Sequence, residues 1–528
     1  MNLEISNGLK AQLQPAVDEL IQAQIASRLA DQDSSIWGPA AQPEASIRLG
    51  WTESARTSME VVPAILQLRD EFRAAGITRF VLCGMGGSSL APEVITKTQG
   101  VNLTVLDSTD PSQVISALVD LERTAVVVSS KSGSTVETDS QKRAFETAFR
   151  AAGIDPIARI VIVTDPGSPL DQTSRAAGYR VFNADPNVGG RYSALTAFGL
   201  VPTGLAGADI TQLLATANNA NSTLFYDSAD NPAIWLAAAM ARTPKSDGTP
   251  GFRDKFLIET DDLAGFGDWA EQLVAESTGK EGKGILPVVV TKSAPEFSVT
   301  LPDTLPIRFS PLAPEAEGIN FSGGLGELFM LWEVATSLAG YLMGINPFDQ
   351  PDVESAKIAA RALLDSPAAA AQPDFVDRKV AVTSYGFDVI GSTVEAALEQ
   401  LMAHANDASY FSIHAYLSRP AFPQLESLRE LLAKRTGRPV TFGWGPRFLH
   451  STGQYHKGGP KQGLFIQLVA DSETDLEIEG RPFSFGSLIA AQAAGDAKVL
   501  ESNGLKVVTL RISDPLAALE LVERVVRS

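Results

Sequence analysis

Two short loops in the first third of the sequence combine small, hydroxyl and basic residues in a way that suits phosphate. The first, Gly84–Ser89, lies between an apolar run and a helical pattern. The second, Ser129–Thr135, carries five hydroxyl side chains and Lys131 in the same setting. Glycines let the backbone approach a ligand, and a helix N-terminus offers unpaired N–H groups to an anion. The two loops predict a small phosphorylated ligand at the carboxyl edge of a parallel sheet.

Other interpretations of these loops stay open. Gly84 and Gly86 match the first two glycines of a dinucleotide-binding turn, and Asp107 closes the next apolar run, where an acid that binds ribose would lie. The third glycine position is occupied by Ser89, which weighs against a dinucleotide. The first loop could also be a plain strand-to-helix turn, and the hydroxyls of the second could be helix caps. Glu137, in the first turn of the helix that follows, is expected only to cap it.

The elements that must position these loops are predicted by the apolar pattern. Residues 1–75 look helical, and short apolar runs then alternate with helical stretches, which predicts parallel strands covered on both faces. The expected fold class is α/β, with two doubly wound parallel-sheet domains and an extra C-terminal α/β region. We expect four segments: an N-terminal helical segment 1–75, a first domain 76–215 with the phosphate loops, a second domain 216–365, and the C-terminal region 366–528.

Composition excludes several classes of protein. The 528 residues carry a formal net charge of −19, which argues against a general nucleic-acid-binding surface. The single cysteine, Cys83, leaves no intrachain disulfide and favours a reducing compartment. It lies in an expected strand, where packing is a better explanation than reactivity.

We find no secretory signal and no membrane span, and expect a cytoplasmic protein. No residues have metal-ligand spacing, so neither a metal nor a redox cofactor is expected.

Five segments in order resemble the motifs of one family. Together they are similar to the sugar-isomerase domain and, more narrowly, to the phosphoglucose isomerases, over about residues 80–360. One departure is Asp352, where the family usually has glycine. The five segments are Gly84–Ser89, Ser130–Glu137, Asn187–Ser193, Ala275–Lys280 and Asn346–Lys357.

The resemblance implies reversible isomerisation of glucose 6-phosphate and fructose 6-phosphate, an activity of glycolysis and gluconeogenesis, in a homodimer whose site lies near the interface. Ring opening and proton transfer through a cis-enediolate need a carboxylate base, an acid/base pair for the ring oxygen and a cation for the oxyanion. By resemblance, Glu276 shuttles the proton, Arg191 stabilises the enediolate, and Lys357 and Gln350 lie at the ring-opening end. The implied phosphate and sugar contacts are Ser130, Lys131, Ser132 and Thr135, with Gly87 and Ser88.

The histidine that should open the ring is displaced. The family places a histidine motif between the glutamate and lysine segments, but no histidine occurs from Glu276 to Lys357. A similar motif, Phe448–Pro460, lies beyond the lysine and contains His450 and, as second candidate, His456. His450 can serve if the C-terminal region folds back or if a partner subunit supplies it. The other two histidines, His404 and His414, are expected to be structural.

The displaced motif resembles the isomerase half of fused transaldolase–phosphoglucose isomerases, although this chain has no transaldolase portion. Three alternatives remain: an isomerase for mannose 6-phosphate or an amino-sugar phosphate, a non-catalytic sugar-phosphate sensor, and an NAD-dependent dehydrogenase. A sensor would keep the Ser130–Thr135 loop without needing Glu276, Lys357 and His450. A dehydrogenase would bind a nicotinamide cofactor.

Overall fold

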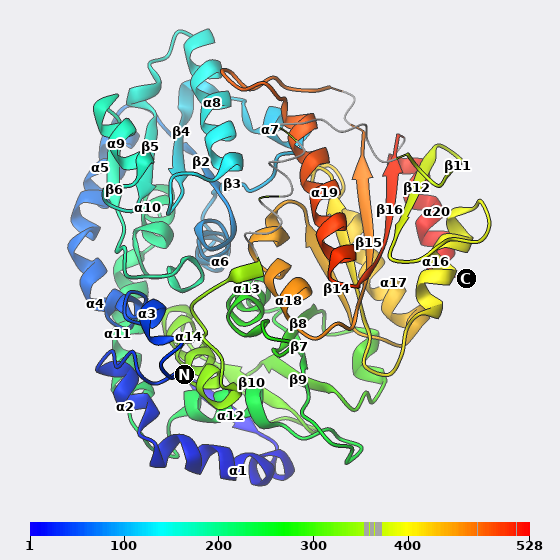
Figure 1. Ribbon diagram of the computed structural model, residues 1–528. Helices are drawn as coiled ribbons and strands as arrows, with labels where there is room; N and C mark the ends of the chain where they lie inside the picture. The colour runs from blue at the N-terminus through cyan, green and yellow to red at the C-terminus, as the bar shows by residue number, and fades with distance from the viewer. Residues whose placement is uncertain (353–357, 359–363, 365–371, 472–473, 514, 528) are drawn as a thin grey trace.

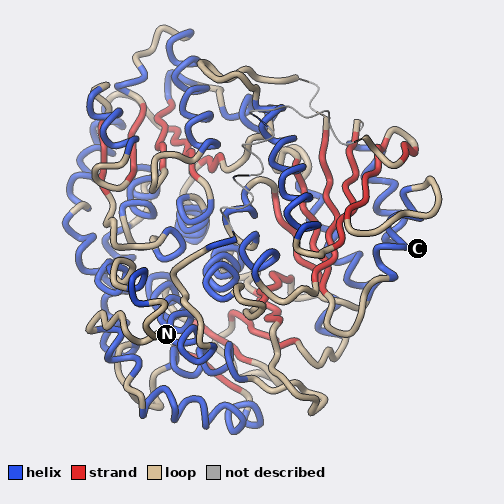
Figure 2. The backbone as a smooth tube through the Cα atoms, viewed as in Figure 1, coloured by secondary structure: helices blue, strands red, loops and turns tan. Residues whose placement is uncertain are grey.

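The computed structural model describes residues 1–528 apart from 353–357, 359–363, 365–371, 472–473, 514 and 528. Its strands form three separate sheets with helices packed around them (Figures 1 and 2). The α/β architecture expected from the sequence is confirmed.

The first sheet carries both phosphate loops. Its order is β3-β2-β4-β5-β6 and all its neighbouring strands are parallel. The strands are β2 (Arg79–Gly84), β3 (Thr104–Leu106), β4 (Thr124–Ser129), β5 (Ile160–Thr164) and β6 (Arg180–Asn183). The helices between and after them are α6 (Leu90–Thr98), α7 (Pro111–Ala117), α8 (Val136–Ala151), α9 (Pro169–Ala176) and α10 (Ala197–Ala206). Cys83 is buried in β2, and burial raises the pKa of its thiol, so it packs rather than reacts.

The second sheet has the order β1-β10-β9-β7-β8, parallel except where β1 pairs with β10. Its strands are β1 (Asn2–Ile5), β7 (Lys255–Glu259), β8 (Leu286–Val290), β9 (Thr304–Phe309) and β10 (Ile319–Ser322). Strand β1 corrects the expectation that residues 1–75 are helical throughout: Leu3 lies opposite Phe321, and this edge pairing makes the segment extended. The helices of this part are α11 (Ile210–Leu224), α12 (Pro232–Arg242), α13 (Phe266–Thr278) and α14 (Leu325–Met343).

The rest of the N-terminal segment is helical and packs on these two units. It comprises α1 (Asn7–Gln22), α2 (Ile25–Ala30), α3 (Gln42–Ala45), α4 (Ser54–Thr57) and α5 (Val62–Ala74). One apolar core runs from α1 and α5 through α10 and α14, so these helices and both sheets form a continuous body.

The C-terminal region builds a third sheet, of order β11-β12-β16-β15-β13-β14, parallel from β16 to β14. Its strands are β11 (Phe375–Asp377), β12 (Val380–Tyr385), β13 (Tyr410–Tyr416), β14 (Val440–Trp444), β15 (Gly463–Ala470) and β16 (Lys506–Ile512). Its helices are α16 (Val394–Ala403), α17 (Ser427–Thr436), α18 (Gly453–Gly458), α19 (Phe485–Ser502) and α20 (Pro515–Arg527).

This third unit packs against both of the others, as Figure 1 shows for α18 and α19. Phe485 and Leu488 of α19 join the core around β2 and β4, while Phe465 of β15 joins the core around β8 and α13. The C-terminal region therefore folds back onto the first two units. Within the described residues, no helix has the length and apolar character needed to cross a membrane.

Glu333 is a carboxyl group inside the apolar helix α14, with 1% of its surface exposed. Burial raises its pKa well above the ordinary value, and no hydrogen-bond partner for Oε1 lies in the described residues. A group whose folded pKa is raised contributes stability that is fully present below its unfolded pKa and is lost as the pH rises toward its folded pKa.

We therefore expect Glu333→Gln to gain on the wild type as the pH rises above about 4.3, by about 1.4 kcal/mol of unfolding free energy per pH unit while only the folded state holds the proton. Urea unfolding at several pH values measures this. Glu60→Gln, at an exposed glutamate, is the control and should show no such trend. A constant difference between Glu333→Gln and wild type would contradict the prediction.

Candidate active site

The first loop is held by two contacts that only glycine allows. A Cβ added at Gly86, where φ is +55°, would lie 2.5 Å from the carbonyl oxygen of His450. A Cβ at Gly87 would lie 2.0 Å from the carbonyl oxygen of Gly190. These glycines therefore allow two distant segments to approach the end of β2, and Ser88 follows them half-buried at the same place.

The second loop ends β4 and starts α8, as the sequence predicts. The hydroxyl of Ser130 donates to Thr135 Oγ1 at 3.0 Å, and Ser132 Oγ lies 2.9 Å from Ser134 Oγ. Lys131 Nζ lies 2.5 Å from Asp165 Oδ2 at the end of β5. Burial raises the pKa of Asp165, although the bond from Lys131 opposes that shift. The loop thus has a cation and hydroxyls in place, with the cation paired to a carboxylate.

Glu276 and Arg191 meet beside the first loop. Glu276 lies near the end of α13, and Arg191 lies in the short 3-10 helix Gly190–Tyr192. Glu276 Oε1 is 3.1 Å from Arg191 NH1, and the amide of Gln272, one helical turn before, donates to Glu276 Oε2 at 3.0 Å. Both Glu276 and Arg191 are buried. This is a carboxylate base held against a guanidinium, away from bulk water.

The loop that follows α14 encloses the guanidinium. Gln350 Oε1 accepts from Arg191 NH1 at 2.6 Å, and the carbonyl oxygens of Pro347 and Asp349 accept from NH2. Lys280 Nζ binds the Asp349 side chain at 2.7 Å and so anchors the loop; burial lowers the pKa of this lysine to about 8. Lys357 lies outside the described residues.

His450 comes back to the site in the same chain. Its Nε2 lies 2.9 Å from Glu137 Oε1, and its carbonyl oxygen accepts from Gln272 Nε2 at 2.7 Å. Glu137 Oε1 also accepts from Gln492 Nε2 at 2.7 Å, so this oxygen sits between two nitrogen donors. With Glu137 ionised, this oxygen only accepts, so Nε2 of His450 carries the proton and Nδ1 is the ring nitrogen left for proton transfer.

Glu137 was expected only to cap α8, and that expectation is wrong. Its side chain is buried and is bound by His450 and Gln492 instead. The sequence does carry a signal for this role. A carboxylate inside a motif that binds an anion would repel the ligand, so its presence suggests that a hydrogen-bond donor elsewhere in the chain binds it. Gln272 is a second site residue that sequence reasoning missed, and its place four residues before Glu276, on the same helix face, could have revealed it.

The other histidines lie elsewhere. His456, the second candidate, is 1% exposed, with Nδ1 2.9 Å from the hydroxyl of Tyr410 inside the third unit, and burial lowers its pKa well below the ordinary value. His414 is buried in β13, and His404 follows α16 with its ring against Phe387. Of the four histidines, only His450 reaches the loops.

Asp352, the departure from the family pattern, has a structural role. Its backbone N–H donates to Gln454 Oε1 at 2.9 Å, and Gln454 Nε2 donates to Asp352 Oδ2 at 2.7 Å. Glycine could not make the second bond. The pair joins the loop beside Arg191 to the helix that follows His450.

Asp107, the acid of the dinucleotide alternative, is buried with Oδ2 3.3 Å from Arg447 NH1. Burial raises its pKa. An acid that binds ribose must offer its carboxylate at the ligand cleft, whereas this carboxylate faces a buried guanidinium. The geometry therefore weighs against a dinucleotide at this sheet.

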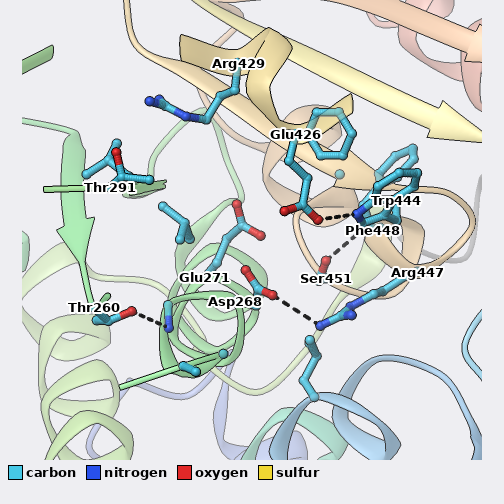
Figure 3. A pocket seen from close by; sticks show the side chains of 18 of the residues that line it. Thr260, Asp268, Glu271, Thr291, Glu426, Arg429, Trp444, Arg447, Phe448 and Ser451 are labelled. Atoms are coloured by element: carbon cyan, nitrogen blue, oxygen red, sulfur yellow. Dashed lines mark hydrogen bonds and ion pairs between the residues drawn. The ribbon is translucent and has the colours of Figure 1, made fainter. Parts of the chain in front are cut away.

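A separate cavity of about 560 Å³ lies on another side of α13, between β8 and the strand β14. Figure 3 shows Asp268 and Glu271 pointing into it from α13, with Arg447 and Trp444 opposite. Burial raises the pKa of Glu271 well above the ordinary value. Neither Glu276 nor His450 lines this cavity, so α13 presents different residues to the two sides.

Gly87 and Gly190, which meet at the first loop, give a matched test of the packing. Gly87→Ala puts a methyl group into the Gly190 carbonyl, and we expect about 1–3 kcal/mol of lost stability, as in overpacked cores. Gly190→Ala is the control, since its Cβ would meet nothing within 4 Å, and it should stay within about 1 kcal/mol of wild type. Denaturant unfolding of both variants measures the difference; equal losses would show that the close approach at Gly87 is unimportant.

Comparison with known proteins gives the family. The sequence model of the family "Phosphoglucose isomerase" matches residues 70–292. Glucose-6-phosphate isomerase of Rubrobacter xylanophilus is 28% identical over 380 residues, 58% of this chain and 87% of the relative. The probable glucose-6-phosphate isomerase of Haloarcula marismortui is 30% identical over 341 residues, 54% of this chain and 77% of the relative.

Solved structures agree in fold. The hypothetical protein TT0462 of Thermus thermophilus matches with a TM-score of 0.57 and 25% identity, over 69% of this chain and 99% of that protein. A glucose-6-phosphate isomerase of Chlamydia trachomatis matches with a TM-score of 0.52 and 20% identity, over 67% of this chain and 85% of that protein. With the sequence matches, these findings show that the chain belongs to the phosphoglucose isomerase family.

Proposed function

We propose that the protein interconverts glucose 6-phosphate and fructose 6-phosphate by ring opening and proton transfer through a cis-enediolate. The observation that carries the proposal is the meeting of Glu276, Arg191 and the His450–Glu137 pair beside two phosphate-type loops. An aldose–ketose isomerisation needs these three kinds of group. A sensor would need only the loops.

In this proposal, His450 opens the sugar ring. Its Nε2–H is held by Glu137 at 2.9 Å, which fixes the ring and stabilises the imidazolium when it forms. Nδ1 is then the atom that exchanges a proton with the sugar ring oxygen. We propose that Lys357 works at the same end of the substrate, with Gln350, whose side chain already contacts Arg191.

The proton moves between C2 and C1 on Glu276. The carboxylate removes the proton from one carbon and returns it to the next, while negative charge builds on the substrate oxygen. Arg191 NH1, 3.1 Å from Glu276 Oε1, lies where it can follow that charge. The phosphate is proposed to bind Ser130, Lys131, Ser132 and Thr135, with the sugar against Gly87 and Ser88.

A coupled assay tests the proposal. Fructose 6-phosphate is supplied, glucose 6-phosphate is detected with its dehydrogenase, and wild type is compared with Glu276→Gln and His450→Ala. Loss of a positioned acid or base should lower the rate by about 10²–10⁴-fold. Asp261→Asn, at an exposed acid after β7, is the control and should keep full activity.

The outcomes separate the alternatives. Turnover by wild type, with both active-site variants impaired, supports glucose-6-phosphate isomerase activity. Turnover of mannose 6-phosphate or an amino-sugar phosphate alone would move the assignment to a related isomerase. Binding of the sugar phosphate without any turnover would indicate a sensor, and a fully active His450→Ala would show that the displaced motif is scaffold.

The homodimer and the cytoplasmic location belong to the same proposal. Because Glu276, Arg191 and His450 meet within one chain, a partner subunit is not needed to complete that set. From the family resemblance we expect light scattering to detect a dimer. From the one-chain site we expect the activity per chain to stay constant when dilution separates the subunits. Activity that falls in step with dissociation would mean that the partner supplies part of the site.

A further inference from the structure

We propose that Gln492, on α19 of the C-terminal unit, is the positioning residue that fixes the Glu137–His450 pair. The proposal deepens the isomerase function above and rests on it, because it names the group that sets the geometry of ring opening. It also gives the C-terminal unit a part in catalysis beyond delivery of His450.

Three buried contacts run in series through the first unit and the C-terminal unit. The hydroxyl of Thr109, after β3, donates to Gln492 Oε1 at 2.6 Å. Gln492 Nε2 donates to Glu137 Oε1 at 2.7 Å, and the same oxygen lies 2.9 Å from His450 Nε2. Thr109, Gln492 and Glu137 are at most 5% exposed, so water does not compete for these bonds.

Only one orientation of the Gln492 amide satisfies its neighbours. If the amide were turned over, its carbonyl oxygen would lie 2.7 Å from Glu137 Oε1, and two acceptors would face each other without a proton. The Thr109 hydroxyl can donate to Oε1, which completes the preferred arrangement. The amide therefore points a fixed N–H at the carboxylate, and the carboxylate in turn holds His450.

The consequence for His450 concerns its orientation. With Glu137 fixed by Gln492, the oxygen that faces His450 Nε2 stays in place, and Nδ1 keeps its direction toward the substrate. Without that amide, the carboxylate can rotate and the imidazole loses its defined tautomer. Hydrogen-bond partners that orient a metal-bound histidine are typically worth about 10–100-fold, and we expect a loss of the same order for this histidine.

The kinetic test uses Gln492→Met, which keeps the size of the side chain but removes the donor. We expect kcat/KM to fall about 10–100-fold, because ring opening slows. With glucose 6-phosphate deuterated at C2, the isotope effect should not exceed the wild-type value, since the step at C2 is unaffected. A rise in the isotope effect would mean that Gln492 acts on proton transfer by Glu276, and it would overturn the proposal, as would unchanged kcat/KM.

The chain offers a matched control. Gln467 in β15 is also fully buried, accepts from the Thr509 hydroxyl at 2.9 Å and donates to Asp496 at 3.1 Å, but it does not touch the site. Gln467→Met makes the same chemical change in the same unit and should leave kcat/KM near wild type. If it lowers kcat/KM as much as Gln492→Met does, the effect is general destabilisation and the proposal fails. Should Gln492→Met not fold, Thr109→Val removes the amide's other anchor and should lower kcat/KM in the same direction.

A spectroscopic test does not depend on activity. With ¹⁵N-labelled histidine only four rings appear, and the signal lost in His450→Gln identifies His450. We expect wild type to show the Nε2–H form, and Gln492→Met to show a mixture or a changed Nε2 shift. An unchanged His450 spectrum in Gln492→Met overturns the proposal. If the spectrum changes but wild type isomerises no sugar phosphate, the positioning stands and the proposed function fails.

Discussion

The structure depends on one buried guanidinium, that of Arg447. Its NH1 lies 2.9 Å from Glu93 in α6 and 3.3 Å from Asp107 after β3, and its NH2 lies 3.4 Å from Asp268 in α13. Burying such a charge is costly unless carboxylates surround it, and removal of one partner from a buried pair typically costs about 3–5 kcal/mol. Arg447 therefore holds the C-terminal unit against the first and second units at the same time.

These ion pairs of Arg447 also position His450, because His450 lies three residues later in the same short helix, Arg447–His450. The backbone of His450 is then held by Gln272 and fits against Gly86, while Gln454 is bound to Asp352. Each contact joins residues far apart in the chain. A histidine motif that lies beyond Lys357 in the sequence can thus still meet Glu137, since contacts rather than chain order define a site.

Sequence patterns predicted what local chemistry determines. The apolar run Ala125–Val128 within β4 and the bounds of α13 follow from burial and helical period, and five motifs indicated the family. Three features were missed, and for two of them the reason lies far away in the sequence. Strand β1 is extended because it pairs with Ile319–Ser322, and the partner that holds Glu137, His450, is 313 residues away. The third, Gln272, lies one helical turn before Glu276. The sequence raised both fold-back and a partner subunit as sources of His450, and the packing of α18 and α19 brings it from the same chain.

The paired cations of the site also bear on how a protein of net charge −19 would bind the proposed phosphorylated ligand. Lys131 is bound to Asp165 and Arg191 to Glu276, so each cation is paired with a carboxylate. In the proposed binding mode, an arriving phosphate replaces Asp165 as the partner of Lys131. Because burial already raises the pKa of Asp165, that carboxyl can take up a proton more easily when the ammonium turns away. A neutral sugar offers no such replacement, so the exchange of ion pairs would itself select for phosphate.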